Sequence, residues 1–112
     1  MNKVMLIGRL TRDAELLQLR DSKRGAVKFT LAVDRDFKKK DGTKDADFIK
    51  VAYWSDHSSK LCPYLTKGKL IGISGKITTG NYINKDGDKK YFSLIQADNI
   101  KFLESKKDSN AV

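Results

Sequence analysis

Apolar and polar residues alternate with a period of two along much of this chain, and that pattern restricts its fold more than any other sequence feature. Four apolar side chains occupy every second position from Val27 to Val33, and the positions between them are mostly polar. Successive side chains of a β-strand point to opposite faces of its sheet. Segment 26–36 is therefore predicted to be a strand with one buried face.

The same β pattern recurs in other segments. Residues 46–54 and 70–79 also alternate, and residues 3–10 and 90–103 are rich in β-forming side chains. Together these segments give five predicted strands, with a weaker candidate strand at 15–19. A chain of 112 residues has room for one domain with one modest core, so we assign all the strands to a single domain.

Two Asp-Gly pairs mark tight turns between predicted strands. Asp41-Gly42 lies between the second and third strands, and Asp86-Gly87 lies between the fourth and fifth. Glycine readily adopts the positive φ that a tight hairpin needs, so both connections are predicted to be β-hairpins.

A short helix is predicted between the third and fourth strands. Within 55–68, either Ser55 or Ser58 is a candidate N-cap, and the leucines at 61 and 65 stand four residues apart. Pro63 falls inside this segment, and proline costs about 3 kcal/mol in a regular helix interior. The helix should therefore be short or kinked at that point.

Three strands, a helix and two further strands follow one another in the order of an OB-fold barrel. We predict an all-β protein, a five-stranded OB-fold Greek-key barrel with one short helix between strands 3 and 4 and extended β-hairpins. Residues 1–104 would form this domain. Residues 105–112 are predicted to be a short flexible C-terminal tail, because the end of the chain has no aromatic residue and little to pack.

The third predicted strand has aromatic residues on both of its faces. If the odd positions 49–53 face the core, then Phe48, Lys50 and Trp54 share the outer face. Burial of a large apolar side chain is worth about 1.5–3 kcal/mol, so displaying two aromatics beside a lysine suggests a partner with flat apolar surfaces and negative charge. Nucleic-acid bases and phosphates fit that description. Burial in a subunit interface or under a loop is the alternative explanation.

Both predicted hairpins also bring an aromatic residue close to lysines. The candidate base-stacking residues are Phe37, Phe48, Trp54 and Tyr82, and in an OB-fold the hairpins rise beside the face of the second and third strands. The candidate phosphate-binding residues are Lys38, Lys39, Lys40, Lys50, Lys76, Lys85, Lys89, Lys90, Arg9 and Arg35. Ordinary hairpin packing for Phe37 and Tyr82, and a solvated loop for any single lysine, are the competing interpretations.

The charge of the chain favours a polyanionic partner, and its composition argues against several other classes of protein. Lys and Arg number 23 against 14 Asp and Glu, a formal net charge of +9. No apolar run approaches the roughly 20 residues of a membrane span, so we expect a cytoplasmic protein. One cysteine, one histidine and two well-separated glutamates offer no disulfide, no metal-binding cluster and no paired-glutamate active site. We expect no catalysis, no cofactor and no small-molecule substrate.

Several sequence blocks also match a known pattern. They are MNKVMLIGRLTRDAEL at 1–16, FTLAVDRDF at 29–37, ADFI at 46–49, YLTKG at 64–68, and GKI and NY between 75 and 82. These blocks resemble bacterial single-stranded DNA-binding proteins of the Gram-positive branch, and the resemblance covers about residues 1–104.

The resemblance implies a homotetramer of OB-folds that wraps single-stranded DNA cooperatively and without sequence preference, in the cytoplasm with the nucleoid. Replication, recombination, repair and DNA uptake are the processes that it implies. It assigns base stacking to Phe37, Phe48, Trp54 and Tyr82, the same four residues that the strand pattern selects.

The sequence departs from the family pattern in two places. Ala14 stands where proline is usual, and segment 17–24 replaces a turn-rich segment, so the shape of the first loop is left open. The family generally ends in a long linker and an acidic tip that recruits enzymes, whereas this sequence ends at Val112 without one. We therefore expect a short form that does not recruit enzymes through a tip.

Other functions are compatible with an OB-fold that displays aromatic residues. An RNA-binding domain of the cold-shock type would use the same stacking face, and a protein-interaction adaptor would use it to hold a protein. An OB-fold nuclease is a third alternative, although the scarcity of glutamates and the lack of a visible metal site argue against it.

Overall fold

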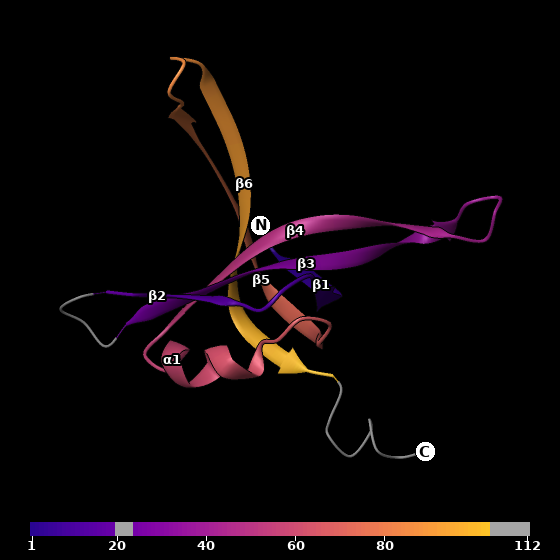
Figure 1. The fold of residues 1–112 in the computed structure, drawn as a ribbon, viewed down its shortest axis with the longest axis horizontal. Helices are drawn as coiled ribbons and strands as arrows, with labels where there is room; N and C mark the ends of the chain where they lie inside the picture. Colours follow the sequence, from indigo (N-terminus) through magenta and orange to yellow (C-terminus); the bar gives the residue numbers. More distant parts are fainter. Residues whose placement is uncertain (20–23, 104–112) are drawn as a thin grey trace.

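The computed structural model describes residues 1–19 and 24–103, and strands dominate this part of the chain (Figure 1). The strands are β1 (Val4–Leu10), β2 (Glu15–Gln18), β3 (Gly25–Lys38), β4 (Lys44–Ser55), β5 (Leu70–Ile83) and β6 (Lys89–Phe102). A helical segment between β4 and β5 consists of α1 (Ser58–Leu61) and the 3₁₀ turn η1 (Cys62–Tyr64). The five long strands agree with the five predicted ones, and β2 corresponds to the weaker candidate at 15–19. The predicted tail, 105–112, lies outside the described residues.

The strands close into a barrel. Their order in the sheet is β1-β5-β6-β4-β3-β2, and β1 also pairs with β3 at Arg9↔Ala32 and Leu10↔Leu31. All neighbouring strands are antiparallel except β4 and β6, which pair in parallel over a few residues. The result is the predicted five-stranded OB-fold barrel, with β2 as an additional short strand beside β3.

The inward-facing side chains of the alternating strands form the core. The buried cluster comprises Leu10, Val27, Phe29, Leu31, Val51, Leu65, Ile71, Ile73 and Ile95. The period-two pattern in β3 is confirmed. Val27, Phe29 and Leu31 are buried, whereas Lys28, which lies between the first two, is exposed. Ile77 shares the inward parity of Ile71 but is 43% exposed, because β5 continues beyond the barrel toward the hairpin.

The helical segment is as short as Pro63 led us to expect, but its N-cap differs from the prediction. His57 occupies the N-cap and makes no side-chain capping hydrogen bond. The Ser55 hydroxyl instead accepts a hydrogen bond from the backbone N–H of His57 at 3.0 Å. Ser58 is buried, and its hydroxyl donates to the carbonyl of Gly25 at 2.8 Å, which fastens the helix to the start of β3. The expectation that Ser55 or Ser58 caps the helix is therefore wrong, because both hydroxyls have other partners.

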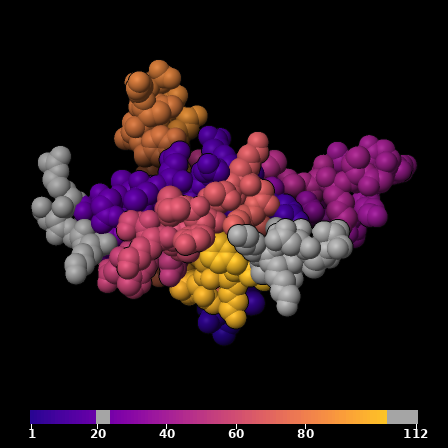
Figure 2. Space-filling view, turned by 60° about the horizontal axis from the view of Figure 1, so that its bottom comes forward, coloured from indigo at the N-terminus to yellow at the C-terminus, as the bar shows by residue number. Residues whose placement is uncertain are grey.

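Two long hairpins extend from the barrel in different directions (Figure 1). The β3–β4 and β5–β6 hairpins turn at Gly42 and Gly87, whose φ angles are +89° and +82°, as the Asp-Gly pairs predicted. Figure 2 shows the two hairpins as separate projections from the body of the molecule. Their outer halves carry mostly exposed side chains.

Candidate nucleic-acid interface

The strand register joins one side of five strands into a continuous surface. Residues directly opposite each other on neighbouring strands lie on the same face of a sheet. Glu15 of β2 is paired with Lys28 of β3, Lys28 with Ala52 of β4, Ala52 with Gln96 of β6, and Gln96 with Lys76 of β5. We call the surface that contains this row of residues the outer face.

The outer face contains the aromatic and basic residues that the alternation of β4 predicted. Phe48 is 69% exposed, and Lys50 is also exposed. Trp54 is half-buried, and Ala52, which lies between Lys50 and Trp54 on this face, is 1% exposed. The prediction that this face of β4 points away from the core is thus confirmed by its register, although not all of its residues are open to solvent.

Trp54 and Lys76 lie near each other on the outer face. Both line a pocket of about 400 Å³, together with Arg24 of the segment before β3 and Gln96 of β6. The opposite parity of Lys76 to the buried isoleucines of β5 had predicted that it faces solvent, and it is exposed. The pocket therefore pairs an aromatic ring with a lysine, although the two residues come from different strands.

A second pocket lies where β4 and β6 diverge. Phe48 and Lys50 of β4 line one side of it, Tyr91 and Phe92 of β6 line another, and its volume is about 440 Å³. Sequence reasoning missed both β6 aromatics. Phe92 shares the parity of Leu94 and Gln96. It could have been chosen as a candidate site residue only from the β5–β6 register.

The hairpin aromatics occupy different positions relative to the outer face. Tyr82 is 55% exposed and its ring lies 6.5 Å from that of Phe92 between centroids, at an interplanar angle of 39°. Phe37 is 84% exposed on the other hairpin. Phe37 lies within the irregular stretch of register between Asp34 and Lys38, so the strand pairing does not assign it to the outer face. The structure therefore links Tyr82 to the outer face through the β5–β6 register and leaves Phe37 apart.

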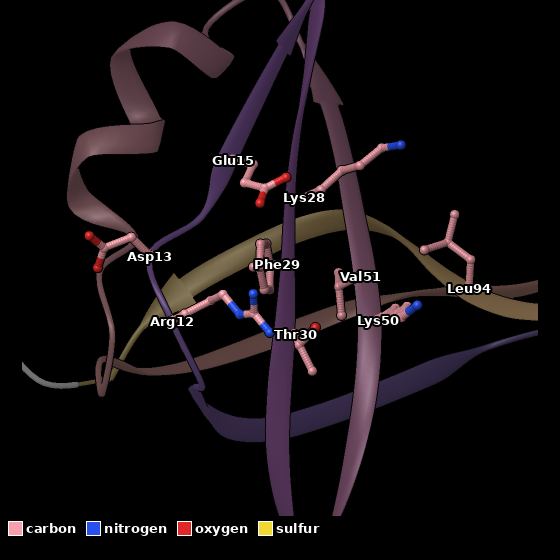
Figure 3. A pocket seen from close by; sticks show the side chains of 9 residues that line it. All are labelled: Arg12, Asp13, Glu15, Lys28, Phe29, Thr30, Lys50, Val51 and Leu94. Atoms are coloured by element: carbon pink, nitrogen blue, oxygen red, sulfur yellow. The ribbon is translucent and has the colours of Figure 1, made fainter.

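A third pocket on the same face is rich in charge. Figure 3 shows Arg12, Lys28 and Lys50 approaching it from three segments, the loop before β2, β3 and β4. Its volume is about 410 Å³, and Asp13 and Glu15 also line it. Lys28 was absent from the predicted phosphate-binding residues, yet its even position in the alternating segment already indicated an outward side chain.

Several predicted phosphate-binding residues already have partners within the chain. The Arg35 guanidinium makes hydrogen bonds of 2.9 and 3.2 Å to the Asp47 carboxylate, and these bonds lower the pKa of Asp47 and raise that of Arg35. Lys39 forms an ion pair with Asp45 at 2.9 Å, and Arg9 donates to the carbonyl of Gly68 at 2.9 Å.

The other predicted phosphate-binding lysines of the two hairpins differ in the face they share and in their contacts. Lys90 is opposite Tyr82 in the register and therefore shares its face, whereas Lys89 is opposite Ile83 and lies over the Tyr91 ring at 5.8 Å. Near the hairpin turns, Lys38, Lys40 and Lys85 are exposed.

Among the residues that the structure describes, no group of three or more His, Cys, Asp and Glu side chains is arranged to hold a metal ion. In the same residues, no helix has the length and apolar character needed to cross a membrane. The single cysteine, Cys62, is half-buried, and burial raises the pKa of its thiol.

Comparison with solved structures defines the class of fold. The structure of a Plasmodium falciparum SSB complex with ssDNA superimposes with a TM-score of 0.80, covering 93% of this chain and 96% of that one at 20% sequence identity. The barrel with its short helix and two hairpins is thus an OB-fold of the kind found in such proteins.

Comparison of sequences identifies the family. Residues 1–103 match the Single-strand binding protein family, and the chain belongs to it. It is 47% identical over 110 residues to single-stranded DNA-binding protein 2 of Clostridium acetobutylicum, covering 98% of this chain and 82% of the relative. Relatives from Clostridium tetani (49% identity, 93% and 71% covered) and Streptococcus mutans (44% identity, 94% and 63% covered) are both called single-stranded DNA-binding protein.

Proposed function

We propose that this protein binds single-stranded DNA without sequence preference and without catalysis. The observation that carries this proposal is the outer face, on which the aromatic rings of Phe48 and Trp54 lie beside Lys50 and Lys76. Membership of the single-strand binding protein family supports the same function. Every base has a flat π-face, so stacking on aromatic rings retains a strand whatever its sequence.

Within this proposal the aromatic and basic residues have separate roles. The bases stack on Phe37, Phe48, Trp54 and Tyr82. The phosphates are neutralised first by the lysines near these rings, Lys50, Lys76 and Lys90, and by the exposed lysines of the hairpin turns. Arg9, Arg35, Lys39 and Lys89 also have partners within the chain, and a phosphate would share or compete for their charge. A protein with this function would act in the cytoplasm with the nucleoid, in replication, recombination, repair or DNA uptake.

Alanine substitution on β4 tests the stacking role. Trp54→Ala and Phe48→Ala should each weaken binding to an oligo-dT by about 1–3 kcal/mol, because each removes one base-stacking ring. The affinity is measured by fluorescence anisotropy of a labelled oligonucleotide.

Tyr64→Ala is the matched control, because Tyr64 is 64% exposed in η1 but lines none of the three pockets of the outer face. If both β4 variants bind oligo-dT as tightly as the Tyr64→Ala variant, stacking on these rings is refuted. An oligo-rU of equal length tests the choice of nucleic acid, and tighter binding to rU would transfer the function to RNA.

We also propose that the protein assembles as a homotetramer through the β1 side of the barrel. Met5 and Ile7 of β1 are 83% and 61% exposed, and with Leu103 they line an apolar groove of about 410 Å³. In the described part of the chain, β1 pairs with β5 over its length but with β3 only at Arg9 and Leu10. The rest of its outer edge can therefore pair with a strand of another copy.

A charge within the groove tests this assembly. Ile7→Glu should shift the protein to smaller species in sedimentation velocity, because an ionised carboxylate is costly to bury in an apolar interface. Lys60→Glu, on α1, is the control and should leave the sedimentation coefficient unchanged. If the unsubstituted protein sediments as a 12.6 kDa monomer at micromolar concentration, the proposed assembly is wrong.

A further inference from the structure

Phe92 lies on the same side of the β5–β6 hairpin as Tyr82. The register pairs Tyr82 with Lys90, Gly80 with Phe92 and Thr78 with Leu94. The same register continues to Gln96, which is opposite Ala52 of β4. Phe92 is therefore part of the outer face and lies between its barrel portion and the outer half of the hairpin.

The Phe92 ring packs against Gly80 of β5. A Cβ added to Gly80 would come within 2.5 Å of Phe92 Cζ and 2.7 Å of Cε1. The ring thus reaches across to β5 and fills the space that any other residue at position 80 would need. Because glycine leaves that space open, the ring is held close to the hairpin backbone while 46% of the residue remains exposed.

The neighbours of Phe92 connect two groups of residues that the proposed function uses. On the barrel side, Phe92 lines the 440 Å³ pocket with Phe48 and Lys50. On the hairpin side, its ring centroid is 6.5 Å from that of Tyr82. Lys90 follows on the same face, opposite Tyr82. Aromatic rings and lysines are therefore interspersed from β4 to the outer half of the hairpin.

We infer that Phe92 is a base-contacting residue that leads the bound DNA strand from Phe48 and Lys50 to Tyr82 and Lys90. This inference rests on the proposed function and specifies the path of the strand on the protein. An aromatic ring that is held in place loses little conformational freedom on binding. Its exposed surface is available to a base, and the adjacent lysines are available to the phosphates on either side of that base.

Two substitutions separate stacking from simple apolar contact. Phe92→Ala should weaken oligo-dT binding by about 5- to 100-fold. Phe92→Leu keeps an apolar side chain but removes the π-face, and it should lose most of the same affinity. Phe92→Trp should retain it. Ile83→Ala is the matched control, because Ile83 is 72% exposed on the opposite face of the same hairpin.

Tryptophan fluorescence gives a readout that a purely structural role would not change. Trp54 is the chain's one tryptophan, so the double variant Trp54→Phe, Phe92→Trp carries a single reporter at position 92. Stacking on a base should quench its emission when oligo-dT is added. Gly80→Ala should weaken binding by displacing the ring, and combining it with Phe92→Ala should cause no loss beyond that of Phe92→Ala alone.

The inference is overturned if Phe92→Ala and Phe92→Leu bind oligo-dT as the unsubstituted protein does, or if the reporter at position 92 is not quenched. An equal loss of affinity in Ile83→Ala would also overturn it, since the hairpin as a whole would then be responsible. If Phe48→Ala and Trp54→Ala still weaken binding in either case, the proposed function stands and only the path through Phe92 fails.

Discussion

Arg35 and Lys50 carry the same charge, but Arg35 is held by a carboxylate of its own hairpin. The Arg35 guanidinium is occupied by Asp47, and Lys39 is occupied by Asp45. Exposed pairs of this kind contribute little because solvent screens them, so a phosphate can displace them at a small cost. A sequence count of basic residues therefore overstates the charge that the β3–β4 hairpin offers to DNA.

Removing the Asp47 charge should release Arg35. Asp47→Asn is expected to tighten oligo-dT binding by about 2- to 5-fold at low salt, with the gain shrinking as salt screens the added charge. Because the pKa of Asp47 is held below its ordinary value, the carboxylate stays ionised at neutral pH, and the effect requires the substitution.

Asp56→Asn is the control for this measurement, since it changes the net charge equally at an exposed site beside α1. Anisotropy titrations at two salt concentrations compare the variants. An equal gain in both variants would show that net charge, and not the release of Arg35, is responsible.

The scale of whole strands explains which parts of the site could be predicted. Parity along a single strand was sufficient for Phe48, Lys50 and Lys76, because alternation alone decides which residues face away from the core. The position of Phe92 beside Tyr82 depends on how β5 and β6 are aligned. A single strand contains no information about that register. The register irregularity between Asp34 and Lys38, which contains Phe37, was equally hidden, since nothing in that sequence marks it.

The alignment of β5 and β6 depends on Gly75. The register shifts between Ser74 and Gly75, and a Cβ at position 75 would collide with the backbone carbonyl of Gln96 and come within 2.8 Å of Ala97 Cα. These are main-chain atoms, so they cannot move aside as a flexible side chain can.

Gly75→Ala should therefore lower the free energy of unfolding by about 1–3 kcal/mol, the usual cost of overpacking a strand interface. Urea denaturation followed by circular dichroism measures the change. Gly72→Ala on the same strand is the comparison, because its Cβ would meet neighbours at ordinary distances of 3.6 Å and more. Similar losses in the two variants would show that the close backbone approach at Gly75 is not what matters.

At the scale of the whole molecule, lysines lie both on the outer face and elsewhere on the surface. Lys28, Lys50 and Lys76 lie in the pockets of the outer face, whereas Lys60 lies on α1. Each phosphate neutralised by a bound cation releases counterions and adds about −0.7 to the slope of log affinity against log salt for a single strand. The slope therefore counts the cations that touch DNA, wherever the other charges lie.

Lys50→Ala should make the salt slope for oligo-dT less negative by about 0.7, whereas Lys60→Ala should leave it unchanged. Titrations between about 50 and 200 mM salt give the slopes. If the slope becomes less negative by the same amount in both variants, long-range attraction by the net charge, and not contact on the outer face, dominates binding.

The two hairpins extend beyond the buried core, and this has a kinetic consequence. Their outer hydrogen bonds are supported by exposed side chains such as Tyr82 and Phe37, so they can break and re-form without unfolding the barrel. Under the proposed function, in which both hairpins contact DNA, a strand would be captured and released stepwise, one hairpin at a time. The barrel would meanwhile serve as a fixed platform, and exchange between neighbouring strands would not wait for complete dissociation.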